Sequence, residues 1–270
     1  MPKPRRHDTG TDKLLVEIDG TIATLSFNNP AKRNALSLEM RSALPGALRA
    51  LQRDEEVRVV VLRGAGDKAF VSGADISEFG ERRTSAEARA DFDAVSAEAA
   101  HAWNALEKPV IAMIRGFCIG GGLLTALQAD IRIAADDARF GVPAAKLGLG
   151  YDYSGVEALV GLVGWGATSE ILFSARQLTA GEAHHIGLVN RVVPAAALED
   201  EVAGLARTVA ANAPLTVAAC KAAIRQARRD PDDRDLAHVG AMVEACFRSE
   251  DYQEGQRAFA DKREPRFTGR

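Results

Sequence analysis

The stretch from Pro109 to Asp130 constrains the fold of this chain more than any other. Its first part, Val110–Ile114, is a short apolar run whose β-branched residues are typical of a strand buried on both faces. Three consecutive glycines, Gly120–Gly122, come next, and the leucines and alanines after them indicate a buried helix. A strand, a glycine turn and a helix N-terminus leave backbone N–H groups unpaired, and glycine lets a ligand approach them. The stretch therefore predicts either a corner that holds an anion or a polarised carbonyl oxygen, or tight strand–helix packing.

Strands and helices alternate along most of the chain. Leu14–Ile18 and Thr21–Phe27 are runs of β-formers on either side of Asp19-Gly20, which predicts a β-hairpin. Further strands are predicted over 57–62, 130–135 and 189–193, and helices over 38–51 (capped by Ser37), 85–106, 154–163, 165–174 and 179–186. Such alternation is typical of right-handed β–α crossover units and predicts an α/β fold.

The chain divides into three predicted parts. Residues 1–12 are charged and have no apolar run, so we expect a disordered arm. Residues 13–195 form the α/β core, and residues 196–270 have a wholly helical pattern. We expect this helical region to cover the core or to join subunits.

Charge and cysteine usage limit the partners and the compartment. The net charge is −3 with both signs mixed throughout, which does not indicate a nucleic-acid surface. No secretory signal is visible, and the apolar run over 109–129 is interrupted by Arg115 and four glycines, so we interpret it as core and expect no membrane partner. The three cysteines lack metal-ligand spacing, and His184 and His185 are predicted to form a surface pair. We therefore expect a cytoplasmic protein without a metal site.

Several short motifs, in their order and spacing, resemble the crotonase family, also called the enoyl-CoA hydratase/isomerase superfamily. They are Asn29-Pro30 with Asn34-Ala35-Leu36, Phe70 to Ile76, Lys108 to Gly122, Ala129 to Ala134, Phe140-Gly141, Leu147-Gly148, Leu172 to Leu178, Ala183 to Val193 and Phe259 to Lys262. The resemblance implies a crotonase-like spiral of β-β-α units with a helical C-terminal region that builds trimers, often paired into hexamers. It also implies an acyl-CoA thioester as substrate, with coenzyme A as part of that substrate and no other cofactor.

The resemblance implies that the backbone N–H groups of Ala74 and Gly121 hold the thioester oxygen. A thioester that loses or gains a proton at its α-carbon passes through an enolate, so negative charge builds on that oxygen. Two preorganised donors in a dry pocket stabilise this charge where it develops. Because backbone amides supply the donors, the side chain of Ala74 matters little.

The resemblance also implies contacts to the rest of the acyl-CoA. The predicted contact residues are Lys32, Arg33, Ser72, Asp75, Ile76, Gly120, Phe140, Phe259 and Lys262. Lys32 and Arg33 are candidates for the phosphates, with a solvated turn as the alternative. Phe259 and Lys262 are expected to reach the nucleotide of a neighbouring subunit, whereas Asp75 is either structural or near the nucleotide.

The sequence departs from the family at the positions that move protons. The hydratases of this family use two glutamates, and their positions correspond here to Leu124 and Ala144, neither of which can transfer a proton. Asp152, eight residues after Ala144 and between Tyr151 and Tyr153, is the remaining acid–base candidate, with a helix N-cap as its alternative role. Its place resembles that of a catalytic aspartate in dienoyl-CoA isomerases and of the nucleophile in aryl-CoA dehalogenases. The dehalogenases' substrate-facing tryptophan corresponds to Ala144, which weakens that comparison.

Two functions follow from these residues. The first is an enzyme that stabilises a thioester enolate during isomerisation, hydration or dehydration, or C–C bond chemistry, with ordinary hydratase activity in doubt. The second is a non-catalytic acyl-CoA-binding protein that has kept the pocket and lost the proton transfer.

Overall fold

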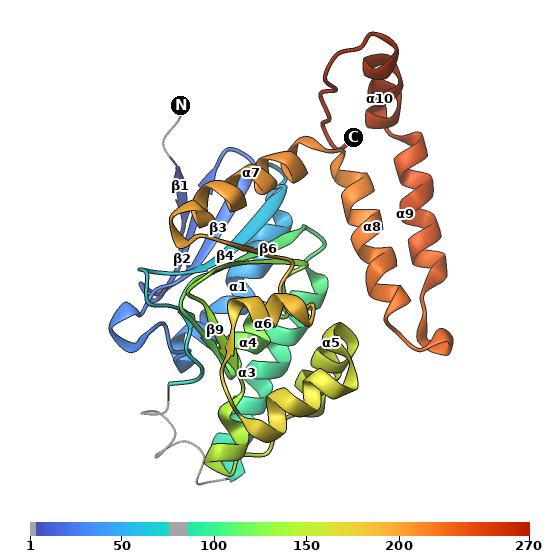
Figure 1. The fold of residues 1–270 in the computed structure, drawn as a ribbon. Coiled ribbons are helices and arrows are strands. Elements are labelled where there is room, and N and C mark those ends of the chain that lie inside the picture. The colour runs from blue at the N-terminus through green and yellow to red at the C-terminus, as the bar shows by residue number, and fades with distance from the viewer. Residues whose placement is uncertain (1–3, 76–85) are drawn as a thin grey trace.

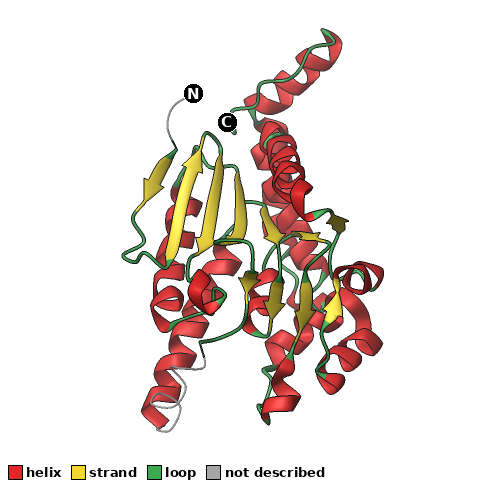
Figure 2. Cartoon of the chain, turned by 60° about the vertical axis from the view of Figure 1, so that its left-hand side comes forward, coloured by secondary structure: helices red, strands yellow, loops and turns green. Residues whose placement is uncertain are grey.

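The computed structural model describes residues 4–75 and 86–270, whose strands form two sheets (Figures 1 and 2). The larger sheet has the order β1-β2-β3-β4-β6-β8-β11, with β1 Arg5–His7, β2 Leu14–Asp19, β3 Ile22–Phe27, β4 Val59–Gly64, β6 Val110–Ile114, β8 Ile131–Ala135 and β11 Arg191–Val193. The smaller sheet has the order β10-β9-β7-β5, with β10 Leu178–Thr179, β9 Arg139–Gly141, β7 Phe117–Ile119 and β5 Ala69–Val71. From β3 to β11 the larger sheet is parallel, as the predicted crossover units require.

The central strands of the larger sheet are buried on both faces. Alternate residues of a strand point to opposite sides, so neighbouring residues join different cores. Val60 and Leu62 of β4 belong to the main core with the helix α1 (Leu38–Arg53), which packs against α3 (Ala86–Ala105). Val59 and Val61 join a second core under α7 (Leu198–Ala211). The first helix of the predicted helical region therefore covers the sheet.

The prediction of a disordered arm over residues 1–12 is wrong for the part of it that the structure describes. Arg5–His7 forms β1, which pairs in antiparallel fashion with β2, at the edge of the sheet in Figure 2. The Arg5 guanidinium lies 2.7 Å from the Asp54 carboxylate and 2.9 Å from that of Glu56. These ion pairs hold a strand without apolar residues, which is why hydrophobic patterning missed it.

The predicted hairpin and first helix are confirmed. Leu14 of β2 lies opposite Phe27 of β3, and the Ser37 hydroxyl accepts a hydrogen bond from the Met40 N–H at 3.3 Å. Pro45 lies inside α1 and does not divide it.

The remaining helices lie below and beside the sheets in Figure 1. They are α4 (Gly121–Ala126), α5 (Tyr153–Ser174), α6 (Ala180–His185), α8 (Pro214–Ala227), α9 (Leu236–Arg248) and α10 (Glu250–Ala260), with a short 3-10 turn η1 (Pro30–Lys32) and another, η3 (Pro143–Leu147). α5 is long and apolar enough to cross a membrane. However, Gly164 has a non-helical backbone (φ 76°, ψ 171°) and divides it where the sequence predicted two helices, so each half is well short of the ~20 residues that a span needs.

Helices α8, α9 and α10 project from the body of the molecule (Figure 1). Midway along α8, the Lys221 ammonium donates hydrogen bonds to the Lys108 carbonyl (2.7 Å) and the Asp130 carboxylate (2.8 Å). Burial lowers the pKa of Lys221 to about 8. A largely apolar hollow of about 590 Å³ lies among the three helices, and Phe259 beside it is 88% exposed.

Candidate active site

The glycine corner is built from β7, a sharp turn and α4. The Gly120 N–H donates to the Gly141 carbonyl at 2.8 Å, and the left-handed backbone of Gly120 (φ 55°) turns the chain into α4. A Cβ on Gly122 would lie 1.9 Å from the Val71 carbonyl oxygen, so this glycine is needed for α4 to pack on β5. A Cβ on Gly121 would meet nothing closer than 3.7 Å. Gly122 thus has the tight packing that one prediction gave. Gly121 is the open position that the other prediction, a corner for an anion or a carbonyl oxygen, requires.

The open side of Gly121 faces the loop that carries Ala74. One of the nearest atoms to a Cβ on Gly121 would be the Ala74 nitrogen, at 3.7 Å. The residues on either side of Ala74 are tied to Leu36, which donates to the Gly73 carbonyl (2.8 Å) and accepts from the Asp75 N–H (3.0 Å). Within the described part of the chain, the N–H groups of Ala74 and Gly121 have no hydrogen-bond partner. Two unpaired donors therefore lie side by side on a loop and a helix start that are both fixed.

The turn with Lys32 and Arg33 is joined to the Ala74 loop. The Ser72 N–H donates to the Arg33 carbonyl at 3.1 Å, and the Ser72 hydroxyl to the Lys32 carbonyl at 3.3 Å. The Lys32 ammonium lies 2.7 Å from the Asp75 carboxylate, which is nearly buried. The Arg33 guanidinium lies over the Phe117 ring, 4.9 Å from its centre. The structure thus brings Lys32, Arg33, Ser72 and Asp75 together beside the corner.

The sequence prediction missed the residue that organises this turn. Asn34 is fully buried with a left-handed backbone (φ 56°). Its side-chain amide donates to the Ala65 and Ala69 carbonyls at 3.0 and 2.8 Å, and its carbonyl oxygen accepts from the Asn29 N–H at 3.0 Å. Asparagine tolerates a left-handed backbone better than most residues, and this preference is the sequence signal that could have identified position 34.

The other predicted contact residues do not gather at the corner in this chain. Phe140 is fully buried in the main core, which leaves its side chain no exposed surface for the predicted contact with acyl-CoA. Phe259 and Lys262 lie on and just after α10, at the end of the projecting helices and far from α4 in Figure 1. Ile76 lies outside the described residues.

The two positions at which the sequence resemblance implies acids in the hydratases hold aliphatic side chains here. Leu124 begins the second turn of α4, and its N–H donates to the Gly120 carbonyl at 3.1 Å. Ala144 lies in η3, half-buried against the main core. Asp152 is exposed at the N-cap of α5, where its carbonyl accepts from the Gly155 and Val156 N–H groups, but its side chain makes no capping hydrogen bond. The carboxylate is therefore accessible and is not used by the helix.

The sequence alone gives Tyr151 no predicted role beyond that of a neighbour of Asp152. Its ring packs against the main core, and its hydroxyl oxygen is buried without a hydrogen-bond partner in the part of the chain that the structure covers. Burial, together with the nearby Asp152 carboxylate, raises the pKa of the Tyr151 hydroxyl well above its ordinary value. The group is a donor at every physiological pH.

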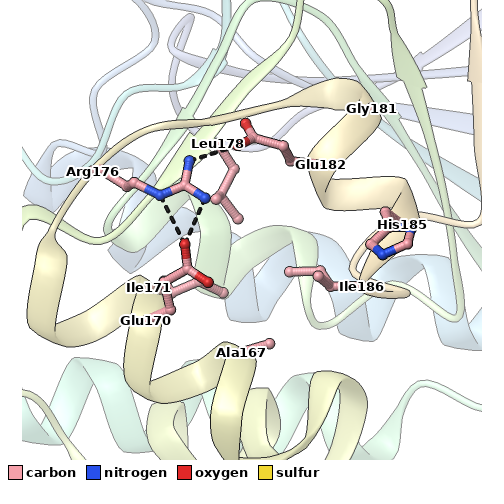
Figure 3. A pocket seen from close by; sticks show the side chains of 9 residues that line it. All are labelled: Ala167, Glu170, Ile171, Arg176, Leu178, Gly181, Glu182, His185 and Ile186. Carbon is pink, nitrogen blue, oxygen red and sulfur yellow. Dashed lines mark hydrogen bonds and ion pairs between the residues drawn. The ribbon is translucent and has the colours of Figure 1, made fainter.

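A second hollow, of about 380 Å³, lies between α5 and α6 (Figure 3). The Arg176 guanidinium bridges Glu170 (2.6 Å) and Glu182 (2.8 Å) across it. The Thr179 N–H and hydroxyl, together with Arg176, lower the pKa of Glu182 to about 2. The guanidinium and the two carboxylates neutralise one another, and their ion pairs link α6 to α5. His184 and His185 are exposed as predicted, and among the described residues no group of three metal-ligating side chains occurs.

Comparison with known proteins gives the same family throughout. The model of the family described as enoyl-CoA hydratase/isomerase matches residues 17–270. The short-chain-enoyl-CoA hydratase of Clostridium acetobutylicum is 37% identical over 93% of this chain and 96% of its own length. The carnitinyl-CoA dehydratase of Salmonella enteritidis is 33% identical over 96% of this chain and 100% of its own. A crystal structure of an enoyl-CoA hydratase/carnithine racemase from Magnetospirillum magneticum superposes with a TM-score of 0.89, is 39% identical, and covers 96% of this chain and 97% of that one.

Proposed function

Because this chain belongs to the enoyl-CoA hydratase/isomerase family and has its crotonase fold, we propose that it stabilises a thioester enolate between the N–H groups of Ala74 and Gly121. The relatives are named as hydratases and dehydratases of acyl-CoA esters, and this chain belongs to the same family of acyl-CoA enzymes. The reaction itself is the part that we propose: isomerisation, dehydration or hydration, or C–C bond chemistry through the enolate.

One observation carries the proposal. Ala74 and Gly121 present two unpaired N–H groups side by side, and each is held by backbone contacts that do not involve a ligand. Donors that are already in place cost no reorganisation when charge develops on the thioester oxygen. In a site that excludes water, one such donor is typically worth about 3 kcal/mol of transition-state stabilisation.

We further propose that Asp152 moves the proton. Leu124 and Ala144 have no titratable group, so water addition by a pair of carboxylates at these positions is absent. Asp152 follows Tyr151, whose ring and the Leu124 side chain both approach Gly155. The Asp152 side chain is exposed and makes no capping hydrogen bond. The aliphatic pair at 124 and 144 also supports a second candidate, an acyl-CoA-binding protein without turnover.

The remaining contacts belong to the coenzyme A part of the substrate. We propose that Lys32 and Arg33 bind its phosphates, since both side chains lie on the turn bonded to the Ala74 loop. Phe259 lies on α10 and Lys262 just after it. A neighbouring copy would cover the apolar hollow among the projecting helices. These features support contacts to the nucleotide of a neighbouring copy in a homotrimer or hexamer. A cytoplasmic location and the lack of a further cofactor stay predictions.

The experiment combines three measurements on the intact protein. Calorimetry with butyryl-CoA measures binding, proton exchange at the α-carbon in heavy water measures enolate formation, and loss of the crotonyl-CoA absorbance measures hydration. We expect binding and exchange, with hydration far below that of an ordinary hydratase. Binding without exchange would favour the binding-protein candidate. Rapid hydration would show that Leu124 and Ala144 do not disable the reaction, and no binding would contradict the proposed function itself.

A further inference from the structure

Tyr151 and Gly155 form a built feature beside the glycine corner. A Cβ on Gly155 would lie 2.9 Å from the Tyr151 ring and 2.9 Å from the Leu124 side chain. Both side chains therefore approach the same point over the first turn of α5, and they can do so only because residue 155 is glycine. The missing side chain at Gly155 thus leaves room for the Tyr151 ring and the Leu124 side chain on the same side of α5.

The position of this ring follows from that of Leu124. Leu124 lies three residues after Gly121 on α4, which corresponds to roughly 4.5 Å along the helix axis. The Tyr151 ring thus lies about one turn of α4 away from the paired N–H groups. In an acyl-CoA thioester, the carbons beyond the α-carbon lie at a comparable distance from the thioester oxygen.

The Tyr151 hydroxyl is a buried side-chain polar group in these surroundings that has no partner among the described residues. Its oxygen is buried, and within the described residues nothing accepts its proton or donates to it. Leu124 and the half-buried Ala144 contribute only alkyl groups. A buried hydroxyl without a partner is destabilising, and a ligand that brings an oxygen removes this cost, whereas a hydrocarbon chain does not.

We propose that the Tyr151 hydroxyl donates a hydrogen bond to an oxygen on the acyl chain, so that the site favours acyl-CoA esters with an oxygen near the β-carbon over unsubstituted ones. This inference rests on the proposed function, because it places the acyl chain beside Leu124. It assigns Tyr151 a positioning role and gives the site a preferred substrate class.

The test compares two ligands that differ by one hydroxyl, 3-hydroxybutyryl-CoA and butyryl-CoA, by calorimetry. Tyr151→Phe is expected to weaken the affinity for 3-hydroxybutyryl-CoA about tenfold and to leave that for butyryl-CoA unchanged, because phenylalanine keeps the ring and removes the donor. Tyr153→Phe is the matched control, since Tyr153 is 77% exposed two residues away, and neither affinity should change.

The outcomes separate this inference from the proposed function. If Tyr151→Phe weakens both ligands equally, the ring has only a packing role and the inference is overturned. If neither affinity changes, the hydroxyl does not meet the acyl chain, while the proposed function stands. If the wild-type protein binds neither ester, the proposed function fails and this inference fails with it.

Discussion

The glycine corner and the segment from Ala144 to Gly155 meet at Gly155, which the side chains of Leu124 and Tyr151 both approach, but they are built in different ways. In the corner the proposed donors are backbone N–H groups, and glycine is required at position 122, where an added Cβ would lie 1.9 Å from the Val71 carbonyl oxygen. In the 144–155 segment, any chemistry depends on side chains that project from a 3-10 turn and a helix start. We propose that the corner stabilises charge through its backbone, whereas the segment supplies the proposed proton-transfer group through a side chain.

The difference teaches that the two halves of such a site can change separately. A backbone donor survives most substitutions, because it needs only the conformation. A general acid or base is lost with a single side chain, and neither Leu124 nor Ala144 has a group that could transfer a proton. We therefore expect the corner to be sensitive to substitutions that change its backbone conformation. The 144–155 segment should be sensitive to substitutions that remove a functional group.

The largest expected effect is on stability, at the packing glycine. In Gly122→Ala the added Cβ would lie 1.9 Å from the Val71 carbonyl oxygen, so α4 and β5 must separate. We expect the free energy of unfolding to fall by about 3 kcal/mol or more, measured by urea denaturation. Gly121→Ala is the control, since its Cβ makes only ordinary contacts. Equal destabilisation by the two would contradict the division between a packing glycine and an open one.

The next effect concerns the donor at Gly121. Gly121 is the first residue of α4, a position where proline is well tolerated, so Gly121→Pro removes the N–H with little harm to the helix. We expect α-proton exchange of butyryl-CoA to slow by about 100-fold, the usual effect of losing one oxyanion donor. Gly121→Ala keeps the N–H and should slow the exchange far less. If both variants exchange alike, the Gly121 N–H is not a donor to the thioester oxygen.

Asp152→Asn tests the other half of the comparison. We expect exchange to fall by about 100-fold, within the range for loss of a general base. The free energy of unfolding should stay within about 0.5 kcal/mol, because asparagine is an equally good N-cap and the Asp152 side chain makes no capping bond. Unchanged exchange in a well-folded variant would remove Asp152 from the site.

Much of this comparison could be predicted from the sequence, because it rests on local patterns. The strand at Val110–Ile114, the cap at Ser37 and the break at Gly164 are signalled by neighbouring residues. The edge strand β1 could not be predicted in this way, because Arg5 finds its partners 49 and 51 residues away. The burial of the Tyr151 hydroxyl could not be predicted either, because it depends on packing against the main core, whose residues are distant in the sequence.

The smallest expected effect has the opposite sign and concerns the Tyr151 hydroxyl. Without ligand, this buried oxygen has no partner among the described residues, so Tyr151→Phe removes a polar group that gains nothing from burial. We expect the free energy of unfolding to rise by about 1 kcal/mol in urea denaturation, whereas Tyr153→Phe at an exposed position should change it by less than about 0.5 kcal/mol. A loss of stability in Tyr151→Phe would mean that the hydroxyl is hydrogen-bonded in the free protein. In that case the segment would be satisfied by itself, and it would have no unused donor to offer a substrate.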